Sequence, residues 1–554
     1  MIYILFKNKK FQILSLLIFL LIDFYLDVER KATILTFIFF VVVLINSNMF
    51  QKHIDLIYKE RSLKNVYVFI YLMLITFLTQ NYLLIYEIID WDISSYMITS
   101  NSVMNGSLPY EVQWESKGPL LYYLYGLVMK IVGGNYIYFK LANDFILCVI
   151  AFILFLSINS NKNTILSIIG STLFILLFSQ PWAVSGYSEL YCLLFIALSY
   201  YSNIYTESKK YLLIGLLMAG STLINQGTIL FVIPFLVVFL SEKNINNILK
   251  FSFGFIFPYI IFILLFSING LMDIFIATYI TIPLEYTSEN FANLYELKVF
   301  FRKFFEYNSY LYYALIAVFL SLVITTFQKI KVNPRDLYLD MMLIFASLLF
   351  YFIGSHNYYH HLLFLLFFVS LFIKNIKSGQ NIYLILIFVS ISLISLISVN
   401  GKNSFEALSN LEETYTNYPL KKLSAEIDGY FNKDYEVLAL EYNLILHYLE
   451  KNNYSYIVHH TNFLEPYIIS TLEDINYIKK DYINYLIANK PDVVICTEWM
   501  IVRGDPIKNP IVNCSKDIFD NSYIQLNTDK YFNKNLNYYN DPYKEIKVFI
   551  KTQS

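Results

Sequence analysis

Long apolar segments alternate with short polar ones over the first 400 residues of the chain. Most of these segments approach the roughly 20 apolar residues that an α-helix needs to cross a bilayer. The pattern therefore predicts a polytopic α-helical membrane protein with about 11–13 transmembrane helices. The candidate spans are residues 11–27, 32–49, 66–88, 138–158, 164–181, 189–205, 211–225, 227–241, 250–269, 309–328, 337–354, 361–376 and 381–400.

The pattern changes after residue 400, where apolar runs become short and charges frequent. The strand-like segments are residues 435–441, 454–460 and 492–498, and the helix-like ones are 442–450 and 482–490. This alternation predicts a C-terminal α/β domain over residues 401–554, following a transmembrane domain over 1–400. The C-terminal part has no phosphate-binding glycine loop, so we expect a structural or acceptor-guiding cap.

Lysine and arginine in the short loops indicate how the chain is oriented, because cytoplasmic loops carry an excess of both. If the N-terminus is cytoplasmic, the basic residues on that side include Lys7, Lys9, Lys10, Lys52, Lys59, Arg61, Lys64, Lys209, Lys210, Lys243, Lys250, Lys329, Lys331 and Arg335. The opposite loops hold far fewer. We therefore expect an inner (cytoplasmic) membrane protein with residues 89–137, 270–308 and everything after 400 outside the cell.

The composition agrees with this class. The chain has 57% hydrophobic and 15% charged residues and a mean hydropathy of +0.51, which leaves too little charge to cover a soluble protein of this length. A net charge of −1 without a basic tail gives no indication of a nucleic-acid partner. Cys148 and Cys192 fall in apolar segments, whereas Cys496 and Cys514 could form a disulfide or remain two unpaired thiols.

The loop over residues 89–137 contains the strongest functional signal. Asp90 and Asp92 follow an apolar helix directly, and an amphipathic stretch begins after them. A turn near Gly106 leads to a second amphipathic stretch that starts at Lys117 and is rich in leucine and tyrosine. Such a segment fits a helix in the membrane interface, where tyrosine and tryptophan are favoured.

The order and spacing of these residues resemble the first outer loop of the GT-C glycosyltransferases. The closest subgroup contains the protein O-mannosyltransferases and the aminoarabinose–lipid A transferases. The positions that carry the resemblance are Asp92, Tyr96, Gly106, Pro109-Tyr110 and Lys117-Gly118-Pro119. The resemblance continues more weakly to about residue 400, and it includes the layout of a many-helix body with a C-terminal outer domain.

The resemblance implies transfer of a sugar from a polyprenyl-phosphate carrier to an acceptor hydroxyl, with inversion at the anomeric carbon. Asp92 is the expected base, because an acceptor hydroxyl needs a proton acceptor and partial burial would raise the pKa of the carboxyl. Asp90 is its rival, and Asp90-Trp91-Asp92 is also a possible metal-binding pair. Relatives that use monophosphate lipids are metal-independent, so we expect no metal and no other cofactor.

The same resemblance suggests donor-phosphate contacts from Lys117, His356 and His360, which lie in or beside loops predicted to be outside. Pocket residues are expected to be Asp90, Tyr96, Glu189 and Tyr359. Glu189 could instead be an exposed loop acid, and the histidine segment could simply pack in the interface. Relatives often have a lysine where this chain has Asn225-Gln226, which weakens the match to the donor site.

Two other classes of function remain open at this point. A lipid-linked sugar flippase or transporter would favour charges in mid-membrane and an internal repeat, whereas the acids here gather at one surface. A surface-polysaccharide polymerase would need a large outer loop, for which residues 270–308 are a modest candidate. The expected partners are the lipid-linked donor, membrane lipid, and a glycolipid, glycan or protein acceptor.

Overall fold

The computed structural model describes most of the chain between residues 61 and 552. The described residues are 61–85, 87, 90–161, 164–179, 186–205, 210–289, 334–353, 359–375, 389, 393, 396–397, 400–432, 434–489, 491–497, 501–502, 505–506, 522–531, 537–538, 541–542 and 546–552. The predicted spans 11–27, 32–49 and 309–328 lie outside them, as does most of 381–400.

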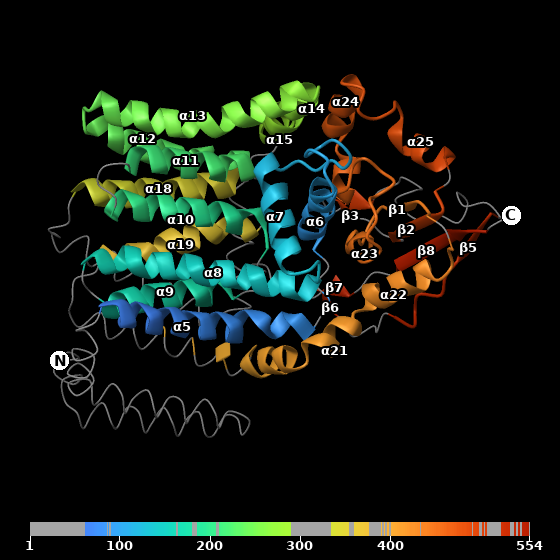
Figure 1. Ribbon diagram of the computed structural model, residues 1–554, viewed down its shortest axis with the longest axis horizontal. Helices are drawn as coiled ribbons and strands as arrows, with labels where there is room; N and C mark the ends of the chain where they lie inside the picture. Colours follow the sequence, from blue (N-terminus) through green and yellow to red (C-terminus); the bar gives the residue numbers. More distant parts are fainter. Residues whose placement is uncertain are drawn as a thin grey trace.

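Apolar helices form a bundle in which they lie side by side with nearly parallel axes (Figure 1). They are α5 (Arg61–Gln80), α8 (Tyr136–Ile158), α9 (Thr164–Phe178), α10 (Ser188–Tyr205), α11 (Lys210–Ile224), α12 (Val232–Ser241), α13 (Ile245–Ile268), α18 (Pro334–Ile353) and α19 (Leu363–Phe372). Short helical turns extend several of them: η2 (Asn81–Ile85), η3 (Asn159–Asn161), η5 (Gln226–Phe231), η7 (Tyr359–Leu362) and η8 (Ile373–Asn375). Within the described residues, each predicted span coincides with one of these helices.

The helices differ in how much of their surface the protein covers. Three are long and apolar enough to cross a membrane, namely Asn65–Ile85, Tyr136–Ile158 and Ile245–Ile268, and shorter apolar helices accompany them. The most apolar window of α8 is 61% buried, whereas that of α13 is only 17% buried. An apolar helix that the protein leaves uncovered needs another apolar medium, and α13 has the exposed apolar surface that such a helix presents to lipid.

Two helices from the first loop lie across one end of this bundle (Figure 1). They are α6 (Trp91–Met104) and α7 (Pro119–Ile131), and each coincides with one of the predicted amphipathic stretches. Gly106 adopts φ +105° just after α6, a conformation that favours glycine. A second connection at this end contains α14 (Met272–Ile276), the π-helical turn η6 (Ala277–Thr281) and α15 (Ile282–Glu289).

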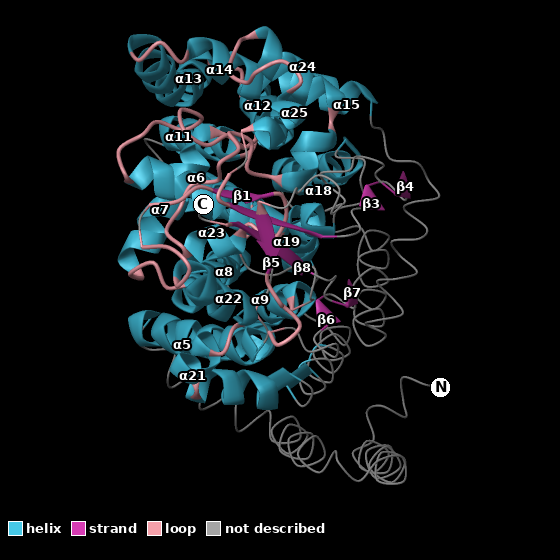
Figure 2. Ribbon diagram, turned by 90° about the vertical axis from the view of Figure 1, so that its right-hand side faces the viewer, coloured by secondary structure: helices cyan, strands magenta, loops and turns pink. Residues whose placement is uncertain are grey.

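The C-terminal region covers α6 and α7 from the side opposite the bundle (Figure 1). Its elements are α21 (Leu411–Thr416), α22 (Pro419–Asp428), β1 (Val437–Ala439), α23 (Leu444–Tyr448), η9 (His460–Leu464), α24 (Pro466–Asp474), α25 (Tyr482–Ala488), β2 (Val493–Thr497), β3 (Ile501–Val502), β4 (Asp505–Pro506), β5 (Tyr523–Gln525), β6 (Asn537–Tyr538), β7 (Asp541–Pro542) and β8 (Ile546–Lys551). Four strands form a sheet in the order β1-β2-β8-β5, seen at the centre of Figure 2.

This sheet contains both parallel and antiparallel pairs. Strand β1 runs parallel to β2, with Val437 opposite Val493, and β8 runs antiparallel to both β2 and β5. The strands β1 and β2 fall inside the segments predicted for them. Cys496 is buried in β2 and disulfide-bonded, whereas Cys514 lies outside the described residues.

One predicted strand does not join the sheet. Residues 454–460 instead form a single parallel bridge, Ile457 with Trp114 of the first loop. The prediction of a regular strand there is wrong because the segment leaves the sheet after Tyr454, whose N–H donates to Val437 O at 2.8 Å. The residues that follow bond to the first loop: Trp114 N donates to Tyr456 O at 2.7 Å and Val458 N donates to Trp114 O at 3.1 Å. The apolar, β-branched composition indicated extended backbone correctly but gave no information about its partner.

Candidate functional site

The two acids at the start of α6 differ in what their carboxylates bind. Asp90 is the N-cap, and its Oδ1 accepts a 2.9 Å hydrogen bond from the backbone N–H of Ile93, a common way to stabilise the first turn. Its Oδ2 accepts a 2.5 Å hydrogen bond from the Tyr187 hydroxyl. Burial, together with the neighbouring Asp92, raises the pKa of Asp90. Both oxygens of Asp90 are therefore occupied by protein donors.

Asp92 lies between two imidazole rings that come from distant parts of the chain. Its Oδ1 is 3.0 Å from Nε2 of His459, its Oδ2 is 3.9 Å from Nε2 of His360, and its side chain is 27% exposed. Burial acts to raise the pKa of Asp92, but the hydrogen bond from His459 and the charges of His459, Lys117 and His360 outweigh it and lower that pKa. The expectation of a raised pKa is therefore wrong, because it took no account of His459.

The Lys-Gly-Pro segment is fixed against the end of α11. The backbone N–H of Gly118 donates to Ile224 O at 2.9 Å. A Cβ atom at this glycine would lie 2.1 Å from Leu223 O, so the close approach requires a residue without a side chain. Pro119 begins α7, a position where its missing N–H leaves no helical bond unmade. These contacts hold Lys117 beside the end of α11.

The Pro-Tyr pair of the loop supports the same lysine from the other side. Tyr110 is fully buried with φ +67°, and its hydroxyl donates to the carbonyl of Lys117 at 2.5 Å. The hydroxyl of Tyr122, in α7, donates to the carbonyl of Glu115 at 3.0 Å. Two buried tyrosines thus fix the backbone on which Glu115 and Lys117 stand.

Glu189 is fully buried in the first turn of α10. Its Oε1 accepts a 3.0 Å hydrogen bond from Asn225 Nδ2 and lies 4.0 Å from Lys117 Nζ and 3.7 Å from His361 Nε2. The Ser188 hydroxyl donates to Oε2 at 3.1 Å. A buried carboxylate needs such donors. Glu189 is therefore not an exposed loop acid, and the asparagine that replaces the expected lysine binds it.

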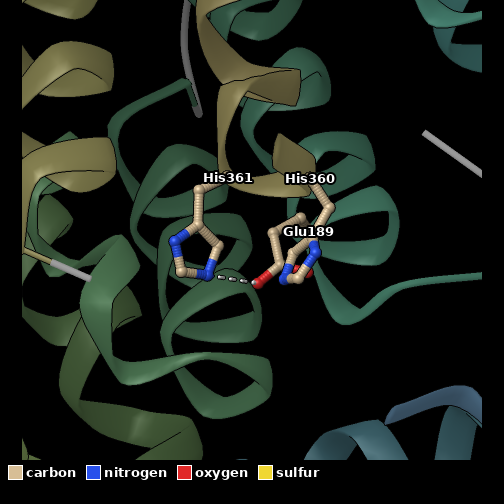
Figure 3. A group of neighbouring side chains, drawn as sticks. All are labelled: Glu189, His360 and His361. Atoms are coloured by element: carbon tan, nitrogen blue, oxygen red, sulfur yellow. Dashed lines mark ion pairs between the residues drawn. The ribbon is translucent and has the colours of Figure 1, made fainter. Parts of the chain in front are cut away.

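His360 and His361 lie on η7, directly before α19, and Figure 3 shows both imidazoles beside the Glu189 carboxylate. The ring of His360 stacks on Tyr187, with centroids 4.2 Å apart. The two histidine rings are nearly perpendicular, at 85°. Consequently His360 approaches Asp92, while His361 approaches Glu189.

The remaining predicted residues have different outcomes. Tyr96 is fully buried one turn after Asp92 on α6, and its ring is in edge contact with Tyr125 at 5.6 Å. Burial and the charges of Asp92, Glu115 and Glu189 raise the pKa of Tyr96, so its side chain lies among these acids. His356 and the side chain of Tyr359 lie outside the described residues.

Glu189, His360 and His361 are arranged so that one ligand atom from each lies within 4.8 Å of the others. Two histidines and one glutamate are a donor set that zinc accepts. However, the Lys117 ammonium lies 4.0 Å from the same Glu189 oxygen and would repel a divalent cation there. A lysine and two imidazoles beside an already paired carboxylate are better suited to an anion such as a phosphate.

Solved structures resemble the chain over most of its length. The crystal structure of ArnT from Cupriavidus metallidurans bound to undecaprenyl phosphate matches with a TM-score of 0.51 and 9% identity, over 79% of this chain and 94% of that one. The chain has the ArnT fold. ArnT is a GT-C enzyme, so the predicted GT-C resemblance is confirmed at the level of the fold, and among the described helices three are long and apolar enough to cross a membrane.

Two further structures are similar to a lesser degree. ArnT from the same organism in the apo state has a TM-score of 0.41 and 10% identity, over 79% of this chain and 93% of that chain. The Archaeoglobus fulgidus oligosaccharyltransferase, tethered to an acceptor peptide, has a TM-score of 0.40 and 9% identity, over 79% and 69%. No protein-family model matches the chain, and no curated protein matches it in sequence.

Three residues of this site were not predicted from the sequence. His361 adjoins the predicted His360, and Glu115 stands two residues before the predicted Lys117, so each had a positional signal. Glu115 is only 2% exposed, and burial raises its pKa. His459 had no such signal, because it comes from the C-terminal region and meets Asp92 only in the folded protein.

Proposed function

We propose that the chain is a membrane glycosyltransferase that moves a sugar from a polyprenyl-phosphate carrier to an acceptor hydroxyl, with inversion and without a metal. The observation that carries this proposal is that Asp92 lies beside His360, while Lys117 and His361 lie beside the adjoining Glu189, in a fold like that of ArnT. This reaction needs two parts: an ionised carboxylate, and hydrogen-bond donors that bind the phosphate of the leaving group.

The reaction follows from these positions. As the bond between the anomeric carbon and the phosphate oxygen breaks, a bond forms between that carbon and the acceptor oxygen. The acceptor proton passes to Asp92, whose lowered pKa keeps the carboxylate ionised before the transfer. The electron pair of the broken bond stays on the polyprenyl phosphate. Lys117 and the two imidazoles bind that phosphate through charge-assisted hydrogen bonds.

The location of the site suits a lipid-linked donor. Both Asp92 and Lys117 lie at the end of the bundle where α6 and α7 cross it (Figure 1). A donor whose chain remains among lipid tails brings its phosphate to the membrane surface, and this is where the helical bundle ends. ArnT has been crystallised with undecaprenyl phosphate, which supports a polyprenyl phosphate as the carrier here. In the proposed orientation this end faces the outside of the cell.

Release of polyprenyl phosphate tests the proposal. The purified protein, in detergent with a chelator, receives a panel of polyprenyl-phosphate sugars and a membrane extract as acceptor. We expect release by the unmodified protein and at least a ~10²-fold loss with Asp92→Asn, because the proton acceptor is removed. Asp273→Asn is the matched control, since Asp273 is an exposed acid in α14 at the same end of the bundle.

The outcomes separate the competing functions. Release with chelator present and loss only in Asp92→Asn support a metal-independent transferase. Release only after Mg²⁺, Mn²⁺ or Zn²⁺ is restored contradicts metal independence. If no donor gives release under any of these conditions, the flippase and polysaccharide-polymerase hypotheses replace this one.

A further inference from the structure

His459 approaches Asp92 from outside the helical bundle. It is buried in the C-terminal region, immediately before η9, and its Nε2 lies 3.0 Å from Asp92 Oδ1. The two residues are separated by more than 360 positions in the sequence, yet this is the shorter of the two imidazole contacts to Asp92. The C-terminal region therefore reaches the carboxylate on which the proposed reaction depends.

The backbone before His459 is held firmly against the first loop. The Ile457–Trp114 bridge ends two residues before it. The buried Gln113 side chain donates to the carbonyls of Asn453 and Ser455, at 3.1 and 3.2 Å, and its Oε1 accepts from the backbone N–H of Asn453 at 2.8 Å. Buried hydrogen bonds of this kind are costly to break, so they fix where His459 stands.

The same contacts align the two halves of the site. Trp114 forms the bridge and stands three residues before Lys117, while its partner Ile457 stands two residues before His459. The indole N–H of Trp114 also donates to Thr278 Oγ1 at 2.7 Å. One junction of the loop and the C-terminal region therefore positions a phosphate-binding lysine and the histidine at Asp92.

Hydrogen bonding on the far side of the imidazole sets which nitrogen carries the proton. Nδ1 accepts from the backbone N–H of Thr461 at 3.3 Å and lies 2.8 Å from the Thr461 hydroxyl. A neutral ring whose Nδ1 accepts a hydrogen bond carries its proton on Nε2, and a protonated ring carries a proton there as well. That Nε2–H points at Oδ1 of Asp92 and leaves Oδ2 as the oxygen that can accept a proton.

We propose that the C-terminal region is part of the active site, and that its His459 is a positioning residue that orients the Asp92 carboxylate through the Nε2–H···Oδ1 hydrogen bond. This inference rests on the proposed function, because it gives Asp92 the role of base. It goes beyond the expectation of a structural or acceptor-guiding cap.

The first test compares three variants in the polyprenyl-phosphate release assay. We expect His459→Ala to lower kcat by about 10- to 100-fold with less than about a twofold change in the donor KM, because misoriented groups lose rate rather than affinity. His459→Gln should recover part of the rate, since its amide can donate to Asp92. His447→Gln is the matched control, because His447 bonds Gly134 O at the same junction but not Asp92.

The pH profile distinguishes orientation of Asp92 from a purely structural role. His459 helps to lower the pKa of Asp92, so its removal raises that pKa. The acid limb of kcat/KM should then move to higher pH in His459→Ala and stay in place in His447→Gln. An unmoved acid limb, or an equal loss of rate in both variants, would overturn the proposal.

A measurement that needs no turnover separates this inference from the proposed function. The melting temperature is measured for Asp92→Ala, His459→Ala and the double variant, because each alanine removes its side of the hydrogen bond. Two groups in direct contact give non-additive effects, so we expect the double variant to melt higher than the sum of the single losses predicts. Additive losses would refute the contact even if transfer occurs. Non-additive losses without any polyprenyl-phosphate release would refute the proposed function alone.

Discussion

Two carboxyl groups of the site have their pKa values moved in opposite directions. Asp92 gains a hydrogen bond and charge from His459, which lowers its pKa. Glu115 is buried beside the same histidine and Lys117, but the loss of hydration prevails and its pKa is raised. Environments that move the pKa values of two acids apart in this way are typical of sites that carry out acid–base catalysis. The lowered pKa favours the ionised form of Asp92, and the raised pKa favours the protonated form of Glu115.

Glu115→Gln tests this difference through stability. The unfolded Glu115 loses its proton near pH 4.5, whereas the folded group retains it to higher pH. The folded state therefore binds more protons in that window, and its stability falls as pH rises from about 4.5 through the raised pKa. A glutamine imitates the protonated acid and does not titrate. The melting temperature of the variant should therefore fall less between pH 4.5 and 8 than that of the unmodified protein.

The control for this variant is Glu111→Gln, because Glu111 is an exposed acid of the same loop. Its melting temperature should follow that of the unmodified protein across the pH range. If Glu115→Gln also follows the unmodified protein, then the ionised Glu115 carries no penalty of burial and a raised pKa of Glu115 is contradicted.

Local spacing made some of these residues predictable and left others hidden. Asp92 and Lys117 were predicted because their spacing within one loop carries the GT-C resemblance, and His360 because the same resemblance implies a histidine at the start of this apolar helix. His459 follows an ordinary strand-like run, and nothing within that run indicates a carboxylate partner. Contacts that form only when distant segments dock cannot be deduced from one sequence.

At the scale of elements, the predictions held where one segment decides its own structure. The loop helices α6 and α7 were expected from amphipathic spacing and from Pro119, and the apolar helices from their length. The regular strand predicted for residues 454–460 was wrong, because an extended segment can satisfy its backbone N–H and C=O groups with whichever partner lies nearby. The partner is the first loop, and this choice brings the C-terminal region to the site.

Gly118→Ala tests the element contact that positions Lys117. The new Cβ would meet the backbone oxygen of Leu223 at 2.1 Å, so α7 must move away from the end of α11. Overpacking of this kind costs about 1–3 kcal/mol. We expect a lower melting temperature and a raised donor KM, because Lys117 moves away from its place beside Glu189.

Gly429→Ala is the matched control, since its Cβ would approach neighbouring atoms no closer than 3.3 Å at an ordinary φ. It should change neither the melting temperature nor the donor KM appreciably. A Gly118→Ala protein with unchanged donor KM would mean that the position of Lys117 does not depend on this contact.

At the scale of the whole molecule, the bundle has two distinct ends. The C-terminal region, α6 and α7 gather at one of them, and α14 and α15 lie at the same end (Figure 1). Thr471 of α24 donates to Glu285 of α15 at 3.5 Å, and the Ser404 hydroxyl donates to Leu78 O at 2.8 Å. The C-terminal region therefore contacts both sides of the bundle at this end. The start of α13 lies at the other end.

Cysteine labelling tests which end faces outward. Lys402→Cys places a thiol at an exposed position close to Ser404, which contacts the end of α5, and Lys250→Cys places one at an exposed position near the start of α13. Because basic residues are enriched in the loops at the α13 start, we expect that end to be cytoplasmic. A membrane-impermeant maleimide should label Lys402→Cys in intact cells and Lys250→Cys only after permeabilisation. The unmodified protein measures the background, since Cys148 and Cys192 are buried.

The result decides which lipid leaflet can supply the donor. Asp92 and Lys117 lie at the same end of the bundle as Lys402, so a thiol labelled there from outside places the site where an outward-facing polyprenyl-phosphate sugar can reach it. The reverse pattern would put the site in the cytoplasm, and transfer would then draw on carriers of the inner leaflet. Labelling of both positions from one side would contradict the arrangement of the helices itself, because the fold separates them by the length of the bundle.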